Sequence, residues 1–398
     1  MSQDIRDLTV EIARGRMLAA AVASGSETVA LEAAIGRVLA EPVTALRDQP
    51  PFDASAMDGW AVSGPGDGFR IMGESAAGHG YHAPLAAGQA VRVFTGAPVP
   101  PGADRVVIQE VAVREGAVVR TSETGGSKHI RPRGGDFREG AVLLQPGLRL
   151  DPWRLSLAAS AGRAALVVAR RPKVVVLSTG EEIVPAGAPI GPDQIYDSGS
   201  PTLAALVAAW GGEPRRLAIA GDDAAAIRDA VRDAGGDLVV TLGGASVGDH
   251  DLVKPALSEL GLDLSVETLK LRPGKPTWFG VLDDGRRVLG LPGNPASALV
   301  CAELFLRPLL MKMQGAAPGP ALLTARLAKP LPANGPREHW ARARSEVRDG
   351  GLFVEAMTDQ DSSLVSVFAQ ADVLIRCPIN APAAEAGDLV EVLRLDRL

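Results

Sequence analysis

The sequence predicts a multidomain protein in which a doubly wound, mainly parallel α/β domain is joined to β-rich and helical parts. First, 398 residues are more than one ordinary hydrophobic core accommodates. Second, nearly all-apolar strands alternate with helical segments from residue 172 onward. Third, residues 43–140 and the chain beyond 316 show short alternating runs between Pro and Gly turns, which are typical of β structure.

The N-terminal half predicts a helical domain interrupted by a β-rich module. Apolar residues at helical spacing over 8–41 predict two helices, and the pattern returns over 152–161. We therefore assign residues 1–43 and 141–170 to one helical domain, with residues 44–140 inserted as the β-rich module. The strand-like runs of the module are Phe69–Met72, Ala90–Phe94 and Arg105–Ile108.

Residues 171–316 are expected to form the α/β domain, because βα units repeat along this stretch. Ligands of such folds bind beyond the carboxyl ends of the strands. The predicted strands are Val174–Leu177, Arg216–Ala220, Leu238–Leu242, Thr277–Phe279 and Arg287–Leu291. The predicted helices are Pro201–Trp210, Asp223–Ala234, Leu252–Leu260 and one that begins at Pro295.

The last part of the chain, residues 317–398, predicts a small β domain behind a Gly/Pro/Ala linker at 315–320. Its alternating segments are Leu322–Leu327, Gly351–Val354 and Leu389–Leu393.

Composition excludes several classes of function. A net charge of -6 argues against nucleic-acid binding, which requires a basic face. Cys301 and Cys377 lie far apart in apolar runs, so neither a disulfide framework nor a cysteine-built metal site is expected. The chain shows neither a signal peptide nor a membrane-spanning apolar run, and we expect a cytoplasmic protein.

Gly-rich turns follow several predicted strands and favour anion binding. They are Ser178–Glu182, Gly243–Gly248 and Pro292–Ser297, with the basic turn Arg272–Pro276 nearby. Backbone N–H groups and helix dipoles converge where a strand ends in glycines before a helix, which suits phosphate. None of these turns is a Walker loop or a dinucleotide fingerprint. Lys275 adds a compact positive charge of the kind that contacts phosphate or oxyanions.

Carboxylates gather at the same predicted strand ends. Beside a phosphate site they make sense when a cation bridges the two, and Mg²⁺ is the usual bridge. The alternative is capping of helix N-termini, for which Asp223 is a good candidate. The carboxylates are Glu181, Glu182, Asp197, Asp222, Asp223, Asp249 and Asp251.

The β-rich module carries three turns with polar tips. They contain Asp58 in Ser55–Gly59, Thr95 in Thr95–Pro100, and Arg131 with Asp136 in Ile130–Asp136. The residues alone leave the function of these turns undecided.

Taken together, the motifs resemble the molybdopterin molybdenumtransferase family, whose relatives include the C-terminal part of gephyrin, over essentially the whole chain. The resemblance is carried by Ser55–Gly59, Thr95–Pro100, Ser178–Glu182, Gly243–Gly248 and Pro292–Pro295. It implies an elongated helical domain, the inserted β module, an α/β domain related to the molybdopterin adenylyltransferases, and a C-terminal β barrel.

The resemblance also implies an activity. Such enzymes take adenylylated molybdopterin and molybdate as substrates, use a divalent cation, here expected to be Mg²⁺, and release AMP. A homodimer is implied, with the β module of one subunit facing the α/β domain of the other. The molybdopterin adenylyltransferase and apo-molybdoenzymes are candidate protein partners.

Site residues follow from the family motifs, position by position. The resemblance assigns catalytic roles to Asp58, Glu182, Asp222, Asp251 and Lys275, and places Glu182, Asp222 and Asp251 at the cation. It assigns substrate binding to Thr95, Arg131, Asp136, Gly243, Gly244, Ser246, Arg272, Pro292, Gly293, Asn294, Arg342 and Ser362.

Three positions depart from the family pattern. Gly199 stands where an asparagine is usual, Thr268 where a basic residue is common, with Lys270 as a nearby substitute, and Asp361 where glycine is common. Asp361 places an acid beside an expected anion site.

Two other functions remain open from the sequence. The chain could make the adenylylated intermediate as a molybdopterin adenylyltransferase, which ATP turnover with molybdopterin would reveal. It could instead be a scaffold that has lost catalysis, although Asp58, Glu182, Asp251 and Lys275 are retained.

Overall fold

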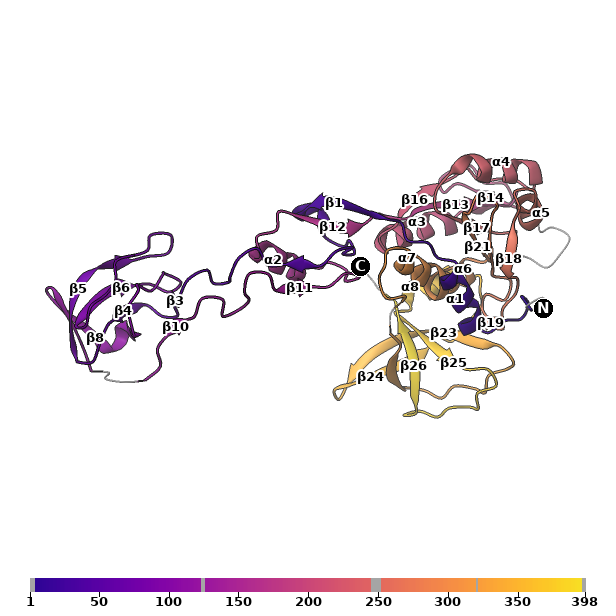
Figure 1. Ribbon diagram of the computed structural model, residues 1–398. Coiled ribbons are helices and arrows are strands. Elements are labelled where there is room, and N and C mark those ends of the chain that lie inside the picture. The colour runs from indigo at the N-terminus through magenta and orange to yellow at the C-terminus, as the bar shows by residue number, and fades with distance from the viewer. Residues whose placement is uncertain (1–3, 123–125, 245–251, 320, 396–398) are drawn as a thin grey trace. The chain divides into compact units, whose positions relative to one another are not determined.

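A computed structural model describes residues 4–122, 126–244, 252–319 and 321–395. The chain forms two compact units, which are described separately (Figure 1). Unit 1 combines Met1–Glu27 with Ala169–Leu398, and unit 2 comprises Thr28–Val168.

Unit 1 contains a six-stranded sheet in the order β16-β13-β17-β21-β20-β18. The first four strands are parallel, whereas β20 is antiparallel to both of its neighbours. This confirms the mainly parallel α/β sheet. The strands are β13 (Lys173–Ser178), β16 (Glu213–Arg216), β17 (Leu238–Leu242), β18 (Asp263–Val266), β20 (Trp278–Val281) and β21 (Arg287–Leu291).

Helices cover both faces of this sheet, as the doubly wound fold requires. Val174, Val176 and Val240 pack with α1, α3, α6 and α7, whereas Val175 and Val239 pack with α4 and α5 on the opposite face (Figure 1). The strands are apolar throughout because both of their faces are buried. The helices are α1 (Val10–Ala19), α3 (Gly199–Ala209), α4 (Ala224–Ala234), α5 (Val253–Ser258), α6 (Pro295–Cys301) and α7 (Arg307–Met313), with a π-helical turn η3 (Ala302–Leu306) between the last two.

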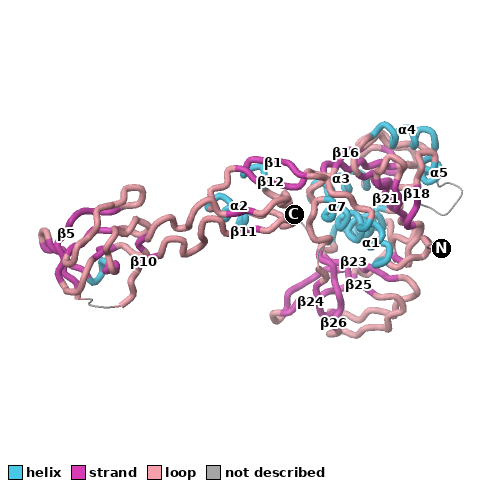
Figure 2. The backbone as a smooth tube through the Cα atoms, in the orientation of Figure 1, coloured by secondary structure: helices cyan, strands magenta, loops and turns pink. Residues whose placement is uncertain are grey.

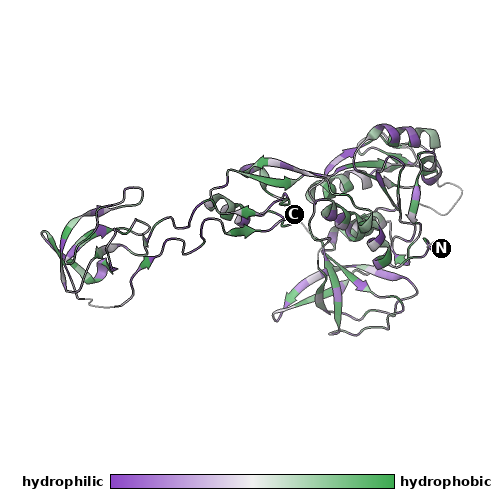
Figure 3. Ribbon diagram, in the orientation of Figure 1, coloured by the Kyte–Doolittle hydropathy of each residue, from purple (hydrophilic) through white to green (hydrophobic). Residues whose placement is uncertain are grey.

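Helix α4 illustrates how the sequence sets these faces. Ile227, Val231 and Ala234 are buried at helical spacing, whereas Arg232 and Asp233 are exposed. Figure 3 shows both hydrophobic and hydrophilic colours on this helix. Within the described ranges, no helix is long and apolar enough to cross a membrane.

The C-terminal strands of unit 1 close into a five-stranded barrel in the order β23-β24-β22-β26-β25, with β25 pairing back to β23. This confirms the β barrel. A short strand from the α/β domain, β19 (Leu271–Arg272), adds to the edge of β23. The remaining elements are β22 (Leu323–Leu327), β23 (Glu338–Arg348), β24 (Gly351–Ala356), α8 (Val365–Gln370), β25 (Val373–Cys377) and β26 (Leu389–Arg394), with the small pair β14 (Ile183–Val184) and β15 (Ile195–Tyr196) in the α/β domain.

Unit 2 is mostly strand and loop, as Figure 2 shows. Its largest sheet has the order β7-β4-β6-β5-β9-β8. The strands of this sheet are β4 (Gly59–Val62), β5 (Gly68–Ser75), β6 (Gln89–Val93), β7 (Arg105–Ile108), β8 (Ala112–Glu115) and β9 (Val118–Thr121). The other elements are β2 (Val43–Thr44), β3 (Ala54–Ser55), η2 (Gln109–Val111), β10 (Ile130–Arg131), β11 (Val142–Leu144) and α2 (Pro152–Ser160).

The prediction of a second helix within residues 8–41 is wrong. The chain there forms β1 (Ser26–Ala30) and one 3₁₀ turn, η1 (Leu31–Ala34). Strand β1 pairs with β12 (Ala165–Ala169), and Leu39 makes a bridge to Val168. Tertiary pairing therefore overrides the helical spacing of the apolar residues. Helix α1 packs in the core of unit 1, and the domain boundaries given above stay predictions.

Candidate functional site

Three loops leave the sheet of unit 1 at the same level. Ser178, Leu242 and Leu291 are in register at the carboxyl ends of β13, β17 and β21. The residues that follow them, including Thr179, Gly243 and Pro292, line one pocket of about 810 Å³. We call this the carboxylate pocket, because its polar wall includes Glu182, Asp197 and Asp222.

Glycines make the floor of this pocket from bare backbone. Gly243 has φ +87°, and a Cβ atom there would lie 2.7 Å from the carbonyl oxygen of Thr179. Gly244 has φ +57°, and a Cβ atom there would collide with Val253. Gly293 packs against Gly243, with 3.5 Å between its Cβ position and the Gly243 Cα. Gly243 and Gly244 therefore have to be glycines, because their backbones lie in the left-handed region and leave no room for a Cβ atom.

The carboxylates of the sheet edge have different surroundings. Glu182 and Asp222 are exposed and line the pocket. Asp223 instead caps α4, since its carboxylate accepts a hydrogen bond from the Ala225 N–H at 2.9 Å. The geometry thus agrees with the capping role that the sequence favoured for Asp223.

Asp197 is a buried member of the same pocket, 5% exposed. Its Oδ1 accepts a hydrogen bond from the Ser200 N–H at 2.9 Å, its Oδ2 accepts from the Ser200 hydroxyl, and Arg216 Nη2 lies 3.8 Å from Oδ2. These partners fix Asp197 at the start of α3.

Two expected site residues, Ser246 and Asp251, lie outside the described residues. Among the residues that are described, no three His, Cys, Asp or Glu side chains gather closely enough to form a preformed metal site. The oxygen donors present in the carboxylate pocket nevertheless suit Mg²⁺, which commonly binds through one or two carboxylates with substrate phosphates and water as the other ligands.

A second pocket of about 910 Å³ lies beside the first, between the 272–276 segment and the loops of the barrel. Arg272, Lys275, Arg337 and His339 line it, and we call it the basic pocket. The two pockets share Pro276, Pro292 and Asn294 as lining residues. Two pockets with different polar linings therefore adjoin in unit 1.

Asn294 and Ser362 connect the α/β domain to the barrel at this shared wall. The Asn294 side-chain amide donates to the Ser362 hydroxyl at 3.0 Å, and the Ala296 N–H donates to the Ser362 carbonyl at 3.2 Å. Both residues line the basic pocket, as does Arg272.

Arg342 has a fully buried side chain that does not line the basic pocket but contacts Gln360 and Asp361, which do. Its Nη1 donates to the Asp361 carbonyl at 2.9 Å and its Nε donates to Gln360 Oε1 at 3.2 Å. Its Nη2 is buried and has no acceptor among the described residues. Burial lowers the pKa of the Arg342 guanidinium from its ordinary value, and Arg272 adds to this lowering. A buried cationic donor without an acceptor favours an anion here.

Asp361, which departs from the family pattern, lines the basic pocket. Hydrogen bonds from the hydroxyl and N–H of Ser363, at 2.6 and 2.8 Å, lower the pKa of this carboxyl. The acid is therefore ionised at neutral pH beside the cations. Ser362 keeps its place in the pocket despite this neighbour.

The other two departures from the family pattern, Thr268 and Gly199, have separate consequences. Thr268 accepts a hydrogen bond from the Asp7 N–H at 2.8 Å and so holds the N-terminal segment. Lys270 is exposed and lines neither pocket, so the structure does not place it as a substitute for a basic residue at 268. Gly199 lines the carboxylate pocket.

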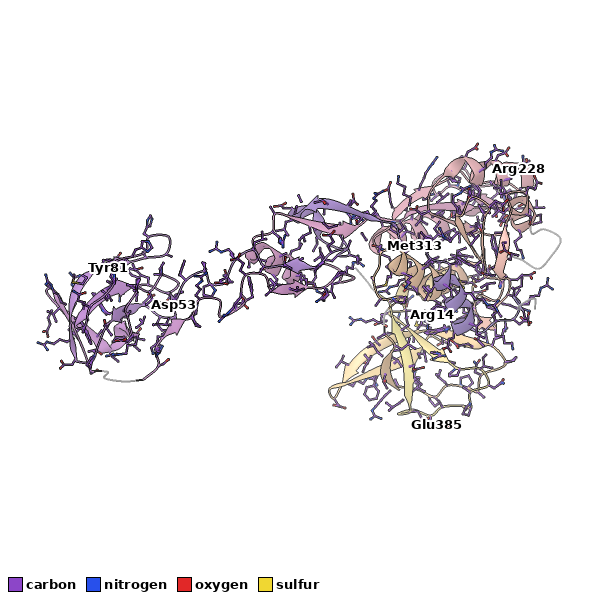
Figure 4. All side chains as sticks on the ribbon, in the orientation of Figure 1. Arg14, Asp53, Tyr81, Arg228, Met313 and Glu385 are labelled. Carbon is purple, nitrogen blue, oxygen red and sulfur yellow. The ribbon has the colours of Figure 1, made fainter. Side chains whose placement is uncertain are left out.

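The residues of unit 2 that the resemblance assigns to the site lie on turns that are joined by hydrogen bonds. Asp58 Oδ1 accepts from the Thr95 N–H at 2.7 Å and from its hydroxyl at 2.8 Å, which lowers the pKa of Asp58. Arg131 on β10 pairs with Ala54 on β3, close in sequence to Asp58. Asp53, labelled in Figure 4, accepts from the Arg133 N–H at 2.7 Å. Arg131 and Asp136 are exposed on this same loop.

Sequence reasoning missed several residues of the basic pocket. Arg337, His339 and Asp359 come from the barrel and its loops, which alternate apolar and polar residues without a recognisable motif. Only the pairing of β19 with β23 brings them beside Arg272 and Lys275. No local signal could have found them.

Comparison with known proteins gives consistent matches along the chain. Residues 8–162 match the MoeA N-terminal region (domain I and II), residues 175–312 a probable molybdopterin binding domain, and residues 324–395 the MoeA C-terminal region (domain IV).

Relatives and solved structures agree with these matches. A molybdopterin molybdenumtransferase of Nostoc sp. is 34% identical, over 93% of this chain and 89% of that protein. One from Haemophilus influenzae is 33% identical, over 97% and 98%. The crystal structure of a molybdopterin biosynthesis MoeA protein from Pyrococcus horikosii superposes with a TM-score of 0.84 at 29% identity, over 99% of this chain and 100% of that one. The chain therefore belongs to the molybdopterin molybdenumtransferase family.

Proposed function

We propose that this enzyme of molybdenum cofactor biosynthesis inserts molybdate into adenylylated molybdopterin and releases AMP, with the oxyanion in the basic pocket and the phosphates in the carboxylate pocket. The observation that carries the proposal is the shared wall of Pro276, Pro292 and Asn294 between a pocket lined by acids and a pocket that also carries Arg272, Lys275 and Arg337. One substrate that spans this wall would bring its phosphates to one side and its metal-binding end to the other.

The carboxylate pocket suits a cation-bridged phosphate. Backbone at Gly243, Gly244 and Gly293 forms its wall, and Glu182 and Asp222 supply oxygen ligands. We propose that these two carboxylates, with Asp251, hold Mg²⁺. The ion would supply neutralisation of phosphate charge at the anhydride. Phosphoanhydride cleavage depends mainly on positioning and on charge neutralisation, so a protein nucleophile is not required.

The basic pocket suits a tetrahedral oxyanion. Arg272 and Lys275 line it, and Arg342 offers a buried donor that lacks an acceptor among the described residues. Arginine and lysine donors to an anionic oxygen form the stronger class of hydrogen bond. We propose that these three residues and Ser362 bind molybdate.

We further propose a homodimer in which unit 2 of one subunit completes the cleft of the other. This follows the family resemblance and would give a role to Asp58, Thr95, Arg131 and Asp136, which lie on tied turns of unit 2. The candidate protein partners are the molybdopterin adenylyltransferase, which would deliver the substrate, and apo-molybdoenzymes, which would receive the product.

Mixing of inactive subunits tests the dimer directly. We would form heterodimers from Asp58→Asn and Glu182→Gln chains, each inactive alone. If the cleft is shared between subunits, one cleft of each heterodimer has both residues intact and activity returns. If each chain completes its own cleft, every cleft lacks one residue and the mixture stays inactive.

The activity itself is tested by AMP release from adenylylated molybdopterin with Mg²⁺, with and without molybdate, coupled to reactivation of an apo-molybdoenzyme. Molybdate-dependent AMP release with reactivation supports the proposal. If a folded protein gives neither AMP release nor reactivation, the result favours the catalytically silent scaffold. Consumption of ATP with molybdopterin would favour the adenylyltransferase reaction.

A further inference from the structure

His339 occupies an unusual place in the basic pocket. It lies on β23, in register with Arg272 of β19 on one side and with Cys377 of β25 on the other. All three residues line the pocket. Its imidazole therefore belongs to the wall where the α/β domain and the barrel meet.

The surroundings of this imidazole disfavour its charged form. Burial, followed by the charges of Arg272, Arg342 and Arg337, lowers the pKa of His339 to about 4. Its Nε2 is buried without a hydrogen-bond partner among the residues that the structure describes. The imidazole is thus neutral at physiological pH while the pocket is empty of anions.

A bound dianion would change this balance. Opposite charge close to an imidazole favours its protonated form, and a dianion would also offset the three guanidinium charges that disfavour it. The chain supplies a histidine where a permanently charged side chain would only add to the repulsion between Arg272, Arg337 and Arg342.

We propose that His339 is a further oxyanion-binding residue, which takes up a proton when a tetrahedral dianion enters the basic pocket. This inference rests on the proposed function, because it requires the oxyanion to bind in that pocket. The proton adds positive charge only when the anion is present, so binding becomes stronger as the pH falls.

The charged and titratable groups around His339 come from every neighbouring element. Arg272 and Lys275 lie in the 272–276 segment, Arg337 and Arg342 before and on β23, Asp359 and Asp361 on the loop after β24, and Cys377 on β25. Burial raises the pKa of the Cys377 thiol to about 11, and the pKa of Asp361 is lowered. Neither group changes charge between about pH 6 and 8.5, the range in which histidine is the expected switch.

The direction of the pH effect follows from linkage. The pKa of His339 is low in the free protein and higher in the complex. The extra binding is therefore present below the pKa of the complex and is lost as the pH rises through it. Between the two pKa values, the affinity is expected to change by up to about tenfold per pH unit. Below about pH 4, where His339 is already protonated in the free protein, the affinity stays high and no longer changes with pH.

Calorimetry and NMR on the full chain test the proposal. We would titrate molybdate into the protein between about pH 6 and 8.5, in buffers of different ionisation enthalpy, to count the protons taken up. Sulfate, which stays a dianion throughout, is the second probe. In parallel, the histidine Cε1–H signals of the wild type would be followed with pH, with and without the anion, and His339→Gln would assign the signal of His339.

The expected result is proton uptake on binding and a His339 signal that titrates at higher pH in the complex. His339→Gln should bind with an affinity that does not depend on pH, whereas the control His82→Gln, in unit 2, should behave as the wild type. Binding without proton uptake, or a His339 signal unmoved by the anion, overturns this inference but leaves the proposed function standing. Absence of binding, or binding that survives Arg272→Gln and Lys275→Met together, overturns the oxyanion site itself.

Discussion

The carboxylate pocket and the basic pocket adjoin in the same unit, yet they are built in different ways. The carboxylate pocket lies at the ends of three strands that are in register, β13, β17 and β21. The basic pocket lies where a two-residue strand, β19, joins the barrel strand β23. One site is a product of a repeated local pattern and the other of a single long-range pairing.

The difference in construction matches a difference in charge. The acids of the carboxylate pocket are exposed except for Asp197. The basic pocket is backed by Arg342, whose side chain is fully buried and held by Gln360. Under the proposed function, the cation would be held by exposed carboxylates, whereas the anion would meet a preformed and desolvated donor.

The largest effect should come from Glu182 in the carboxylate pocket. We expect Glu182→Gln to reduce AMP release by about 100-fold or more, because several kcal/mol of charge stabilisation depend on the bound cation. The dependence on Mg²⁺ concentration should shift, while molybdate binding stays unchanged. Glu181→Gln is the matched control, since Glu181 is exposed and lines neither pocket. Near-normal AMP release by Glu182→Gln would remove the cation role of this pocket.

The next effect belongs to the basic pocket. Arg342→Lys keeps the charge but loses the planar donor set, so we expect molybdate affinity to fall roughly 10- to 100-fold. The free energy of unfolding should also fall by about 1–3 kcal/mol, because buried partners of Arg342 lose their donors. Calorimetry and denaturant unfolding measure the two effects.

Arg228→Lys provides the control for this substitution. Arg228 lies on α4, labelled in Figure 4, and pairs with Asp229 and Glu259 away from either pocket lining. It should bind molybdate as the wild type does. Equal loss of affinity in both variants would mean that Arg342 acts only through stability.

A smaller effect separates the two neighbouring acids, Asp222 and Asp223. Asp222→Ala should slow AMP release by roughly tenfold, or about 1.4 kcal/mol, with little loss of stability. Asp223→Ala should lower the free energy of unfolding by about 1 kcal/mol through loss of the α4 cap, with AMP release unchanged. The reverse pattern in kinetics and unfolding would reassign the pocket acid.

The smallest effect concerns Asp361. Its ionised carboxylate opposes an anion in the basic pocket, so Asp361→Asn should raise molybdate affinity by about two- to fivefold, as for an exposed charge. Because the pKa of Asp361 is lowered, the gain should be constant above pH 6. A fall in affinity would contradict this repulsive role of the Asp361 carboxylate.

The comparison of the two pockets also explains which features of the protein the sequence could predict. Repeated apolar strands followed by glycines predicted the sheet, the edge at which Gly243 and Pro292 meet, and the acids beside them. The strand expected at Arg216–Ala220 lies instead at Glu213–Arg216, because its charged residues give no apolar signal and only pairing with β13 defines it.

Only some residues of the basic pocket could be predicted from the sequence. Arg272 and Lys275 stand in a recognisable turn, and the family motif indicated Arg342 and Ser362. His339 and Arg337 could not be found, because their contribution depends on the register of β19 with β23. The wrong prediction of a helix near residues 29–39 has a similar cause, because the pairing of β1 with β12 determines the structure there.

The most direct test of two cooperating pockets is the rate of AMP release measured against Mg²⁺ and molybdate concentration, in the wild type, Glu182→Gln and Lys275→Met. We predict that Glu182→Gln, besides lowering the rate, shifts the Mg²⁺ requirement but not the molybdate requirement, and that Lys275→Met shifts the molybdate requirement but not the Mg²⁺ requirement. A molybdate requirement altered by Glu182→Gln alone, with the Mg²⁺ requirement unchanged, would contradict the assignment of the two pockets.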